Sequence, residues 1–167
     1  MITEDEFWRR EWKIASNWAA WSINAYGLKR AAEVLWSVGG EDVAVDVAAM
    51  MLTGYALENA IKALLLHRKP ELCTPERAPR WPGGGHDLAR LFDEAGVGVS
   101  VEERRLLDQL SEFVVWRGRY TMPQSREIFR AGKVLQWVTS PYPFEASPDH
   151  REIAYRLFDR TLDLLPG

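Results

Sequence analysis

The apolar residues of this chain recur with the spacing of α-helices from the N-terminus onward. Between about residues 3 and 37 the steps between them are seven and then alternating fours and threes, which is helical periodicity. This stripe comprises Phe7, Ile14, Trp18, Trp21, Ala25, Leu28, Ala32 and Leu35. A second apolar stripe, which includes Trp8 and Trp12, runs beside the first. We therefore expect one long helix covered on two sides, by its own bundle and by a partner chain or the loop after Tyr120.

A second helical block spans about residues 41–67, and its apolar residues step by four and three throughout. Its main stripe comprises Val43, Val47, Met50, Gly54, Leu57, Ile61 and Leu64. Glu58 and Lys62 fall on the neighbouring stripe. We therefore expect these two charged side chains at the margin of the core and not on the solvent face.

Glycines help to arrange these two blocks. Gly39 and Gly40 separate them, so we expect the two helices to turn back on each other as an antiparallel pair. Gly54 lies inside the second block, where a glycine costs up to about 1 kcal/mol relative to alanine. We expect Gly54 to be there because it allows another helix to pack closely.

Three shorter helical blocks come next along the chain. One spans residues 87–95 and ends at Gly96, a residue suited to the left-handed position after a helix. The next begins with Ser100 and Glu103, which have the spacing of a capping box. The last begins at Pro148, which comes after a serine and suits the first position of a helix.

Residues 120–147 give a less regular signal. Within them, residues 125–139 fit a helix and also fit a hairpin strand, and we favour helix with irregular loop. The whole pattern predicts an all-α fold, an up-down bundle of four to five helices. We expect residues 1–167 to form a single domain, because this length suits one hydrophobic core.

Composition and charge narrow the classes of partner. The formal net charge is -3, whereas general duplex-binding proteins usually carry a basic excess. Any contact with nucleic acid must therefore use a local basic patch. The single cysteine, Cys73, forms no internal disulfide, and the chain starts with an acidic segment and has no apolar run of membrane-spanning length. We expect a cytoplasmic protein that does not enter a membrane.

The first candidate for chemistry is the pair Glu58 and Lys62, which has the i,i+4 spacing of a helical ion pair with the acid on the N-terminal side. Charges drawn towards a core need partners, and Arg117, Arg119 and Asp87 are available. A structural polar network and a functional site are both consistent with this position.

The second candidate is the segment WRGRY at residues 116–120, in which Arg117 continues the core stripe of its helix. Arg117 and Arg119 could form an anion site, because two guanidinium groups offer forked donors to a phosphate. The alternative is that they stabilise a helix C-terminus and remain solvated.

The third candidate is His86, which comes after three glycines and precedes Asp87 at the start of a helix. His86 could act as a general base or could cap the helix. The glycine spacing matches neither the P-loop nor the dinucleotide fingerprint, so a flexible loop is the simpler interpretation. The remaining histidines and Cys73 lack the spacing of metal ligands, and we expect no metal and no cofactor.

Three segments of the chain resemble the HEPN superfamily (higher eukaryote and prokaryote nucleotide-binding). Residues 54–64 read GYALENAIKAL and look like the second helix of HEPN domains. The segments GHDL at 85–88 and WRGRY at 116–120 look like the regions after that helix in several bacterial branches of the superfamily. The resemblance implies a helical bundle that usually dimerises and acts in toxin–antitoxin, abortive-infection or other defence systems.

Many HEPN proteins are metal-independent endoribonucleases, marked by an arginine followed by a histidine after four to six residues. In this chain no histidine comes after Arg117 or Arg119 at that distance, whereas Arg80 and His86 have the spacing within a glycine-rich loop. Other members lack the motif and bind partners, often a nucleotidyltransferase.

These residues and the resemblance lead to three hypotheses for the function. The first is a non-catalytic HEPN-like module that binds RNA, a nucleotide or a partner, such as an antitoxin or a nucleotidyltransferase. The second is an endoribonuclease with His86, Arg117 and Arg119 as catalytic residues. The third is a homodimer that serves only as an interaction protein, with Trp8 and Trp12 at its interface. The residues expected to line the site are Glu58, Lys62, Arg80, Asp87 and Tyr120.

Overall fold

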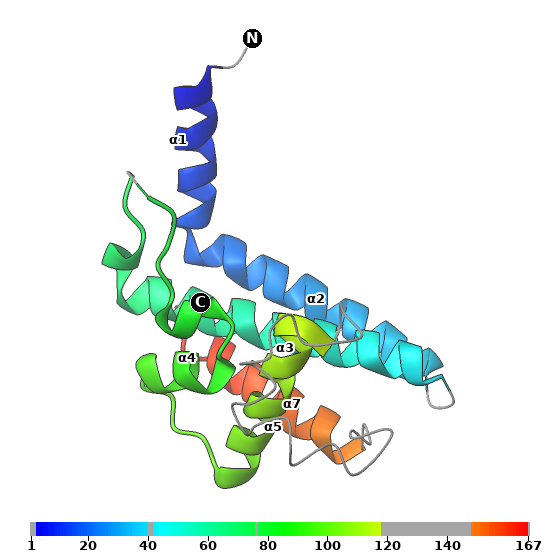
Figure 1. The fold of residues 1–167 in the computed structure, drawn as a ribbon. Coiled ribbons are helices and arrows are strands. Elements are labelled where there is room, and N and C mark those ends of the chain that lie inside the picture. The colour runs from blue at the N-terminus through cyan, green and yellow to red at the C-terminus, as the bar shows by residue number, and fades with distance from the viewer. Residues whose placement is uncertain (1–2, 40–41, 76, 118–147, 167) are drawn as a thin grey trace.

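The computed structural model describes residues 3–39, 42–75, 77–117 and 148–166. In these ranges the fold is an all-α helical bundle, as the sequence predicts (Figure 1). The α-helices are α1 (Glu4–Ala15), α2 (Trp18–Val38), α3 (Val43–Arg68), α4 (Leu88–Glu94), α5 (Val101–Glu112) and α7 (Pro148–Leu162). Single turns of other helix types are η1 (Pro70–Leu72), η2 (Pro82–Gly85) and η3 (Phe113–Arg117). Residues 120–147, with the choice between helix and hairpin for 125–139, lie outside the described ranges.

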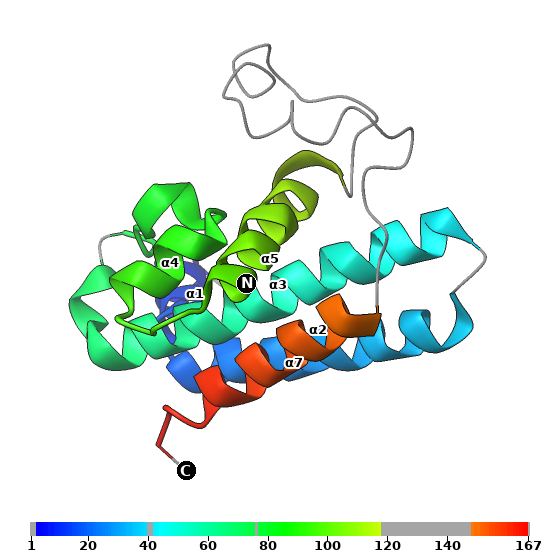
Figure 2. The same ribbon diagram turned by 90° about the horizontal axis from the view of Figure 1, so that it is seen from below.

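Helix α3 lies at the centre of the bundle. It runs antiparallel to α2 along most of its length, which confirms the predicted pair, and α7 lies beside both helices (Figure 2). Helices α4 and α5 pack on another side of α3. The core is therefore built around α3, with Leu57, Ile61, Leu64 and Leu65 among its fully buried side chains.

Gly54 lies where α3 packs closely against the end of α5 and the start of η3. A Cβ atom placed on it would lie 2.7 Å from Cγ2 of Val114 and 3.2 Å from the carbonyl oxygen of Leu110. Any side chain at this position would push the two helices apart. The expectation that Gly54 allows close packing is confirmed.

The prediction of one helix over residues 3–37 is wrong, because the chain bends after Ala15. Asn17 caps the second helix with its side-chain oxygen, which accepts a hydrogen bond from the Ala19 amide at 3.0 Å. The Trp21 indole closes the bend by donating to the Ala15 carbonyl at 3.0 Å. An asparagine side chain competes with the helix for backbone groups, and here it starts a new helix.

As a result α1 projects from the rest of the bundle, and none of its residues is buried (Figure 1). Its second apolar stripe rests on the loop between η1 and η2. The Trp8 indole donates to the Pro75 carbonyl at 2.6 Å, and the Trp12 side chain lies beside the thiol of Cys73. Burial raises the pKa of that thiol. The stripe thus contacts a loop that precedes α4, and the role of Trp8 and Trp12 at a dimer interface stays a prediction.

The ends of the shorter helices agree with the predicted signals. Gly96 has φ +69° after α4, and Ser100 and Glu103 form both hydrogen bonds of a capping box at the start of α5. Leu164, just after the end of α7, is 43% exposed. Within the described ranges, no helix has the length and apolar character needed to cross a membrane.

Candidate functional site

Glu58 of α3 is the centre of a group of three polar side chains, called the polar cluster below. Its Oε1 atom lies 2.5 Å from Nζ of Lys62, one helical turn later. Its Oε2 atom lies 2.9 Å from Nδ1 of His86, which comes directly after η2. The cluster therefore joins α3 to the loop before α4, and each carboxylate oxygen has a different partner.

The three side chains differ sharply in exposure. The side chains of Glu58 and Lys62 are 6% and 5% exposed, whereas that of His86 is 48% exposed. A buried charge is tolerated when it is paired, and the two buried charges here neutralise each other at hydrogen-bond distance. His86 is thus the member of the cluster that a ligand can reach.

Two tryptophans enclose the ammonium group of Lys62. Its Nζ atom lies 5.5 Å from the ring centre of Trp21 in α2 and 5.2 Å from that of Trp81 before η2. The two indoles meet edge to face at 5.1 Å. A cation over aromatic rings is attracted by their quadrupoles, so the two indoles help to hold the Lys62 ammonium group in place.

Gly85 lets the loop approach this enclosure. Its φ is +86°, a left-handed conformation that side chains rarely adopt. A Cβ atom there would lie 3.1 Å from Cβ of Trp81 and 3.3 Å from Nζ of Lys62. The left-handed turn and the lack of a side chain together bring His86 within reach of Glu58.

The next residue fixes the direction of the following helix. Asp87 is the N-cap of α4 and accepts a hydrogen bond from the Arg90 amide at 3.1 Å. The Leu88 amide donates to Oγ of Ser111 in α5 at 2.9 Å. Asp87 and not His86 therefore caps the helix, and the alternative in which His86 is the cap is wrong.

This geometry determines which chemistry the His86 ring could supply. The carboxylate of Glu58 accepts, so the hydrogen of a neutral imidazole lies on Nδ1 and the lone pair lies on Nε2. A carboxylate that orients an imidazole in this way is the arrangement found in general-base sites. Glu58 is buried and both of its oxygens are hydrogen-bonded, so Nε2 of the exposed His86 is the atom of the cluster placed to take a proton from a ligand.

The other predicted site residues are only partly placed. Arg117 ends η3, which packs on α3, and its side chain lies outside the described part of the structure. Arg119 and Tyr120 also lie outside the described residues. Arg80 is exposed in the loop before η2. The structure thus brings Glu58, Lys62 and His86 together and leaves the joint site with Arg117 and Arg119 a prediction.

Sequence reasoning missed Trp21 and Trp81 as members of the site. Trp21 lies on the apolar stripe of its helix and has the pattern of a core residue, and Trp81 lies in a loop with no periodic signal.

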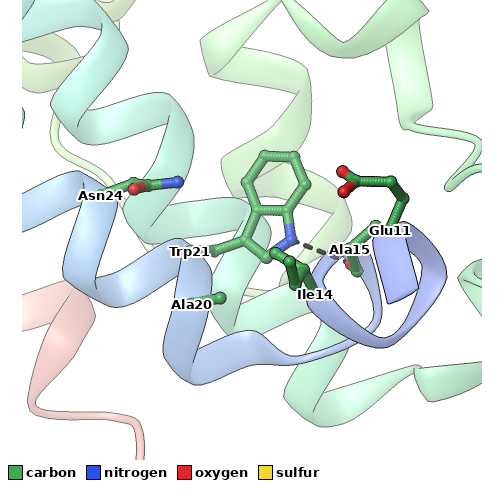
Figure 3. A pocket seen from close by; sticks show the side chains of 6 residues that line it. All are labelled: Glu11, Ile14, Ala15, Ala20, Trp21 and Asn24. Carbon is green, nitrogen blue, oxygen red and sulfur yellow. Dashed lines mark hydrogen bonds between the residues drawn. The ribbon is translucent and has the colours of Figure 1, made fainter. Parts of the chain in front are cut away.

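A small open pocket of about 190 Å³ lies at the bend between α1 and α2, and it is called the elbow pocket below (Figure 3). Figure 3 shows the Trp21 ring between the Glu11 carboxylate and the Asn24 amide. Its lining comprises Glu11, Ile14, Ala15, Ala20, Trp21 and Asn24. Trp21 therefore belongs both to the elbow pocket and to the enclosure of Lys62.

In the described ranges, no group of three or more histidine, cysteine and acidic side chains is placed to hold a metal ion. Comparison of this chain with protein-family models, with curated proteins and with solved structures found no match.

Proposed function

We propose that this chain is a HEPN-like protein of a bacterial defence or toxin–antitoxin system that binds RNA or a nucleotide at the polar cluster. The observation that carries the proposal is the hydrogen bond between Glu58 and His86, which fixes an exposed imidazole on a buried support. The segments that resemble HEPN domains include all three residues of the cluster. As in that superfamily, the functional unit is a homodimer with an antitoxin or a nucleotidyltransferase as its partner.

The chemistry of His86 supports a ligand that carries hydroxyl and phosphate groups. The Nε2 atom accepts a hydrogen bond from a ribose hydroxyl when the imidazole is neutral, and it donates to a phosphate oxygen when the ring is protonated. The glycines before His86 leave room for a ligand, because a Cβ atom on Gly84 would meet no atom within 4 Å.

Binding is tested by fluorescence anisotropy with a labelled mixed-sequence RNA pool and with mononucleotides. His86→Ala is expected to weaken binding by about tenfold, which corresponds to roughly 1.4 kcal/mol. His67→Ala is the matched control, because His67 is exposed in the last turn of α3, outside the polar cluster, and its ring packs against Trp18. Equal affinities for the wild type and His86→Ala would remove the cluster from the ligand site.

The same hydrogen bond favours a second function, metal-independent cleavage of RNA. Nε2 of His86 would remove the proton from a ribose 2′-hydroxyl, and the oxygen would attack the adjacent phosphorus. The bond to the 5′-oxygen then breaks, that oxygen takes a proton from water, and the products are a 2′,3′-cyclic phosphate and a 5′-hydroxyl. Arg117 and Arg119 are the residues proposed to stabilise the charged phosphorane.

Incubation with the RNA pool separates the two functions. Cleavage by the wild type and by His67→Ala, with cyclic phosphate ends and no activity of His86→Ala, supports the ribonuclease. Binding without cleavage identifies a binding module. Cleavage that persists in His86→Ala would rule out His86 as the base.

A further inference from the structure

The elbow pocket has a polar rim whose groups have no partner among the described residues. Glu11 and Asn24 form no hydrogen bond or ion pair there, although both lie beside an aromatic ring. A pocket with a tryptophan floor and unused acceptors is a binding site for a group that brings hydrogen-bond donors.

The sequence of α1 explains why Glu11 is free. On a helix, a side chain meets the residues three and four positions away, and for Glu11 these are Phe7, Trp8, Ile14 and Ala15. All four are apolar, so no cation of its own helix is in reach. Phe7 and Ile14 are 57% and 49% exposed, and they continue the same face on both sides of the carboxylate.

We propose that the elbow pocket binds an arginine side chain of a partner protein, with apolar residues of the partner segment against Phe7 and Ile14. The guanidinium group matches each wall of the pocket. It is planar and stacks on the Trp21 indole, it donates in a fork to the Glu11 carboxylate, and it can donate further to the Asn24 amide oxygen.

Charge decides against a nucleotide in this pocket. The approach of a phosphate to the unpaired Glu11 carboxylate is unfavourable, whereas a cation gains a partner there. The elbow pocket thus prefers a cation, whereas the adjacent polar cluster is proposed to bind a ligand with phosphate groups, and Trp21 contributes to both. The proposal for the elbow pocket does not depend on whether RNA binds at His86.

The test uses the peptide acetyl-Leu-Arg-Leu-amide and its counterpart with citrulline, which keeps the shape of arginine and lacks the charge. The readout is the indole N–H resonance of Trp21 in the full chain labelled with ¹⁵N, assigned with Trp21→Phe. The arginine peptide is expected to shift this resonance saturably, and the citrulline peptide to bind about tenfold more weakly.

Glu11→Gln keeps the size of the side chain and is expected to reduce affinity for the arginine peptide by about tenfold. Asp5→Asn is the matched control, because Asp5 is an exposed acid of α1 that does not line the pocket, and it should leave affinity unchanged. Far-UV circular dichroism checks that both variants remain helical.

Three outcomes would overturn the proposal. They are equal binding of the arginine and citrulline peptides, unchanged affinity in Glu11→Gln, and a saturable shift of Trp21 with guanosine monophosphate but not with the arginine peptide. Loss of RNA binding in His86→Ala with intact peptide binding separates this site from the polar cluster.

Discussion

Glu11 lines a pocket beside Trp21, Glu58 pairs with the Lys62 ammonium that lies over the same indole, and the surroundings of the two glutamates are opposite in character. Glu58 is buried, and both of its oxygens are used by Lys62 and His86. Glu11 is exposed, and it has no ion pair among the residues that the structure describes. Both glutamates sit beside apolar stripes of their helices.

The difference comes from the residue one turn further along each helix. Lys62 lies four positions after Glu58 and supplies a counter-charge that enters the core with it, whereas Ala15 holds the same position after Glu11. A glutamate with its own cation becomes part of the structure. A glutamate among apolar neighbours remains available to another molecule.

The strongest test of this comparison makes the same substitution at both positions. Glu58→Gln leaves the ammonium group of Lys62 buried without a counter-charge and is expected to lower the free energy of unfolding by about 3–5 kcal/mol. Glu11→Gln should leave it unchanged, because the side chain is exposed and unpaired. Urea denaturation followed by circular dichroism measures both. Equal losses would show that burial of the pair contributes little.

Adding Lys62→Met to Glu58→Gln sharpens the result. The double variant removes both charges, so it should recover much of the lost stability. A double variant that is less stable than Glu58→Gln would mean that Lys62 stabilises the core mainly through Trp21 and Trp81.

The second prediction concerns the glycine turn that precedes His86 of the polar cluster. Gly84→Ala is expected to cost about 1–2 kcal/mol, because a left-handed backbone is unfavourable for alanine and its Cβ atom meets nothing within 4 Å. Gly85→Ala should cost a further 1–3 kcal/mol or so, because its Cβ atom presses on Trp81 and Lys62. Thermal and urea unfolding give the difference. Equal costs would show that the loop shifts freely away from α3.

The third prediction concerns the bend that forms the elbow pocket. Asn17→Ala removes the oxygen that caps α2 and should cost about 1 kcal/mol. Asn17→Asp keeps an acceptor and should retain nearly full stability. The free energies of unfolding of the two variants provide the measurement, and a harmless Asn17→Ala would mean that the hydrogen bond from Trp21 alone holds the bend.

The smallest effect is expected at Tyr155 of α7. In the described structure its hydroxyl is buried like the carboxylate of Glu58 and unpaired like that of Glu11. Burial raises the pKa of Tyr155 to about 12. Because the pKa of this acid is higher in the folded than in the unfolded state, the contribution of Tyr155 to the free energy of unfolding is complete below the usual pKa near 10. It decreases as the pH rises towards 12.

Tyr155→Phe should therefore change stability little at pH 7 and should lose less stability than the wild type above pH 10 or so. Urea denaturation at pH 7 and at alkaline pH tests this sign. Parallel losses in both proteins would assign the alkaline unfolding to other groups.

The sequence predicted most of the fold because helix signals are local. The four-and-three steps located α3, and Ser100 with Glu103 located the start of α5. The bend after Ala15 was missed because an apolar stripe reports which face is covered and not whether the helix is continuous. Asn17, which caps α2, was the signal for a new helix, and it was missed because the apolar stripe continues past it.

The sequence predicted one contact of the candidate site and missed others. The spacing of Glu58 and Lys62 revealed their pairing, because i,i+4 contacts are fixed by helix geometry. The contact of His86 with Glu58 spans 28 residues and depends on the left-handed turn at Gly85, which no periodic pattern encodes. Trp21 contributes to both the elbow pocket and the enclosure of Lys62 because of how the helices pack, and the sequence pattern does not show this.

The contact of α1 with the loop after η1 has a consequence for the chemistry of the chain's single thiol. Cys73 is 7% exposed in the loop after η1, where the Trp12 side chain lies beside its thiol and Trp8 is hydrogen-bonded to Pro75. Because the thiol is buried beside Trp12, we expect a small alkylating reagent to react with it faster when α1 moves away from the loop, and the rate of modification then measures how often that local opening occurs. Cys73 thus reports the attachment of the N-terminal helix without any introduced label.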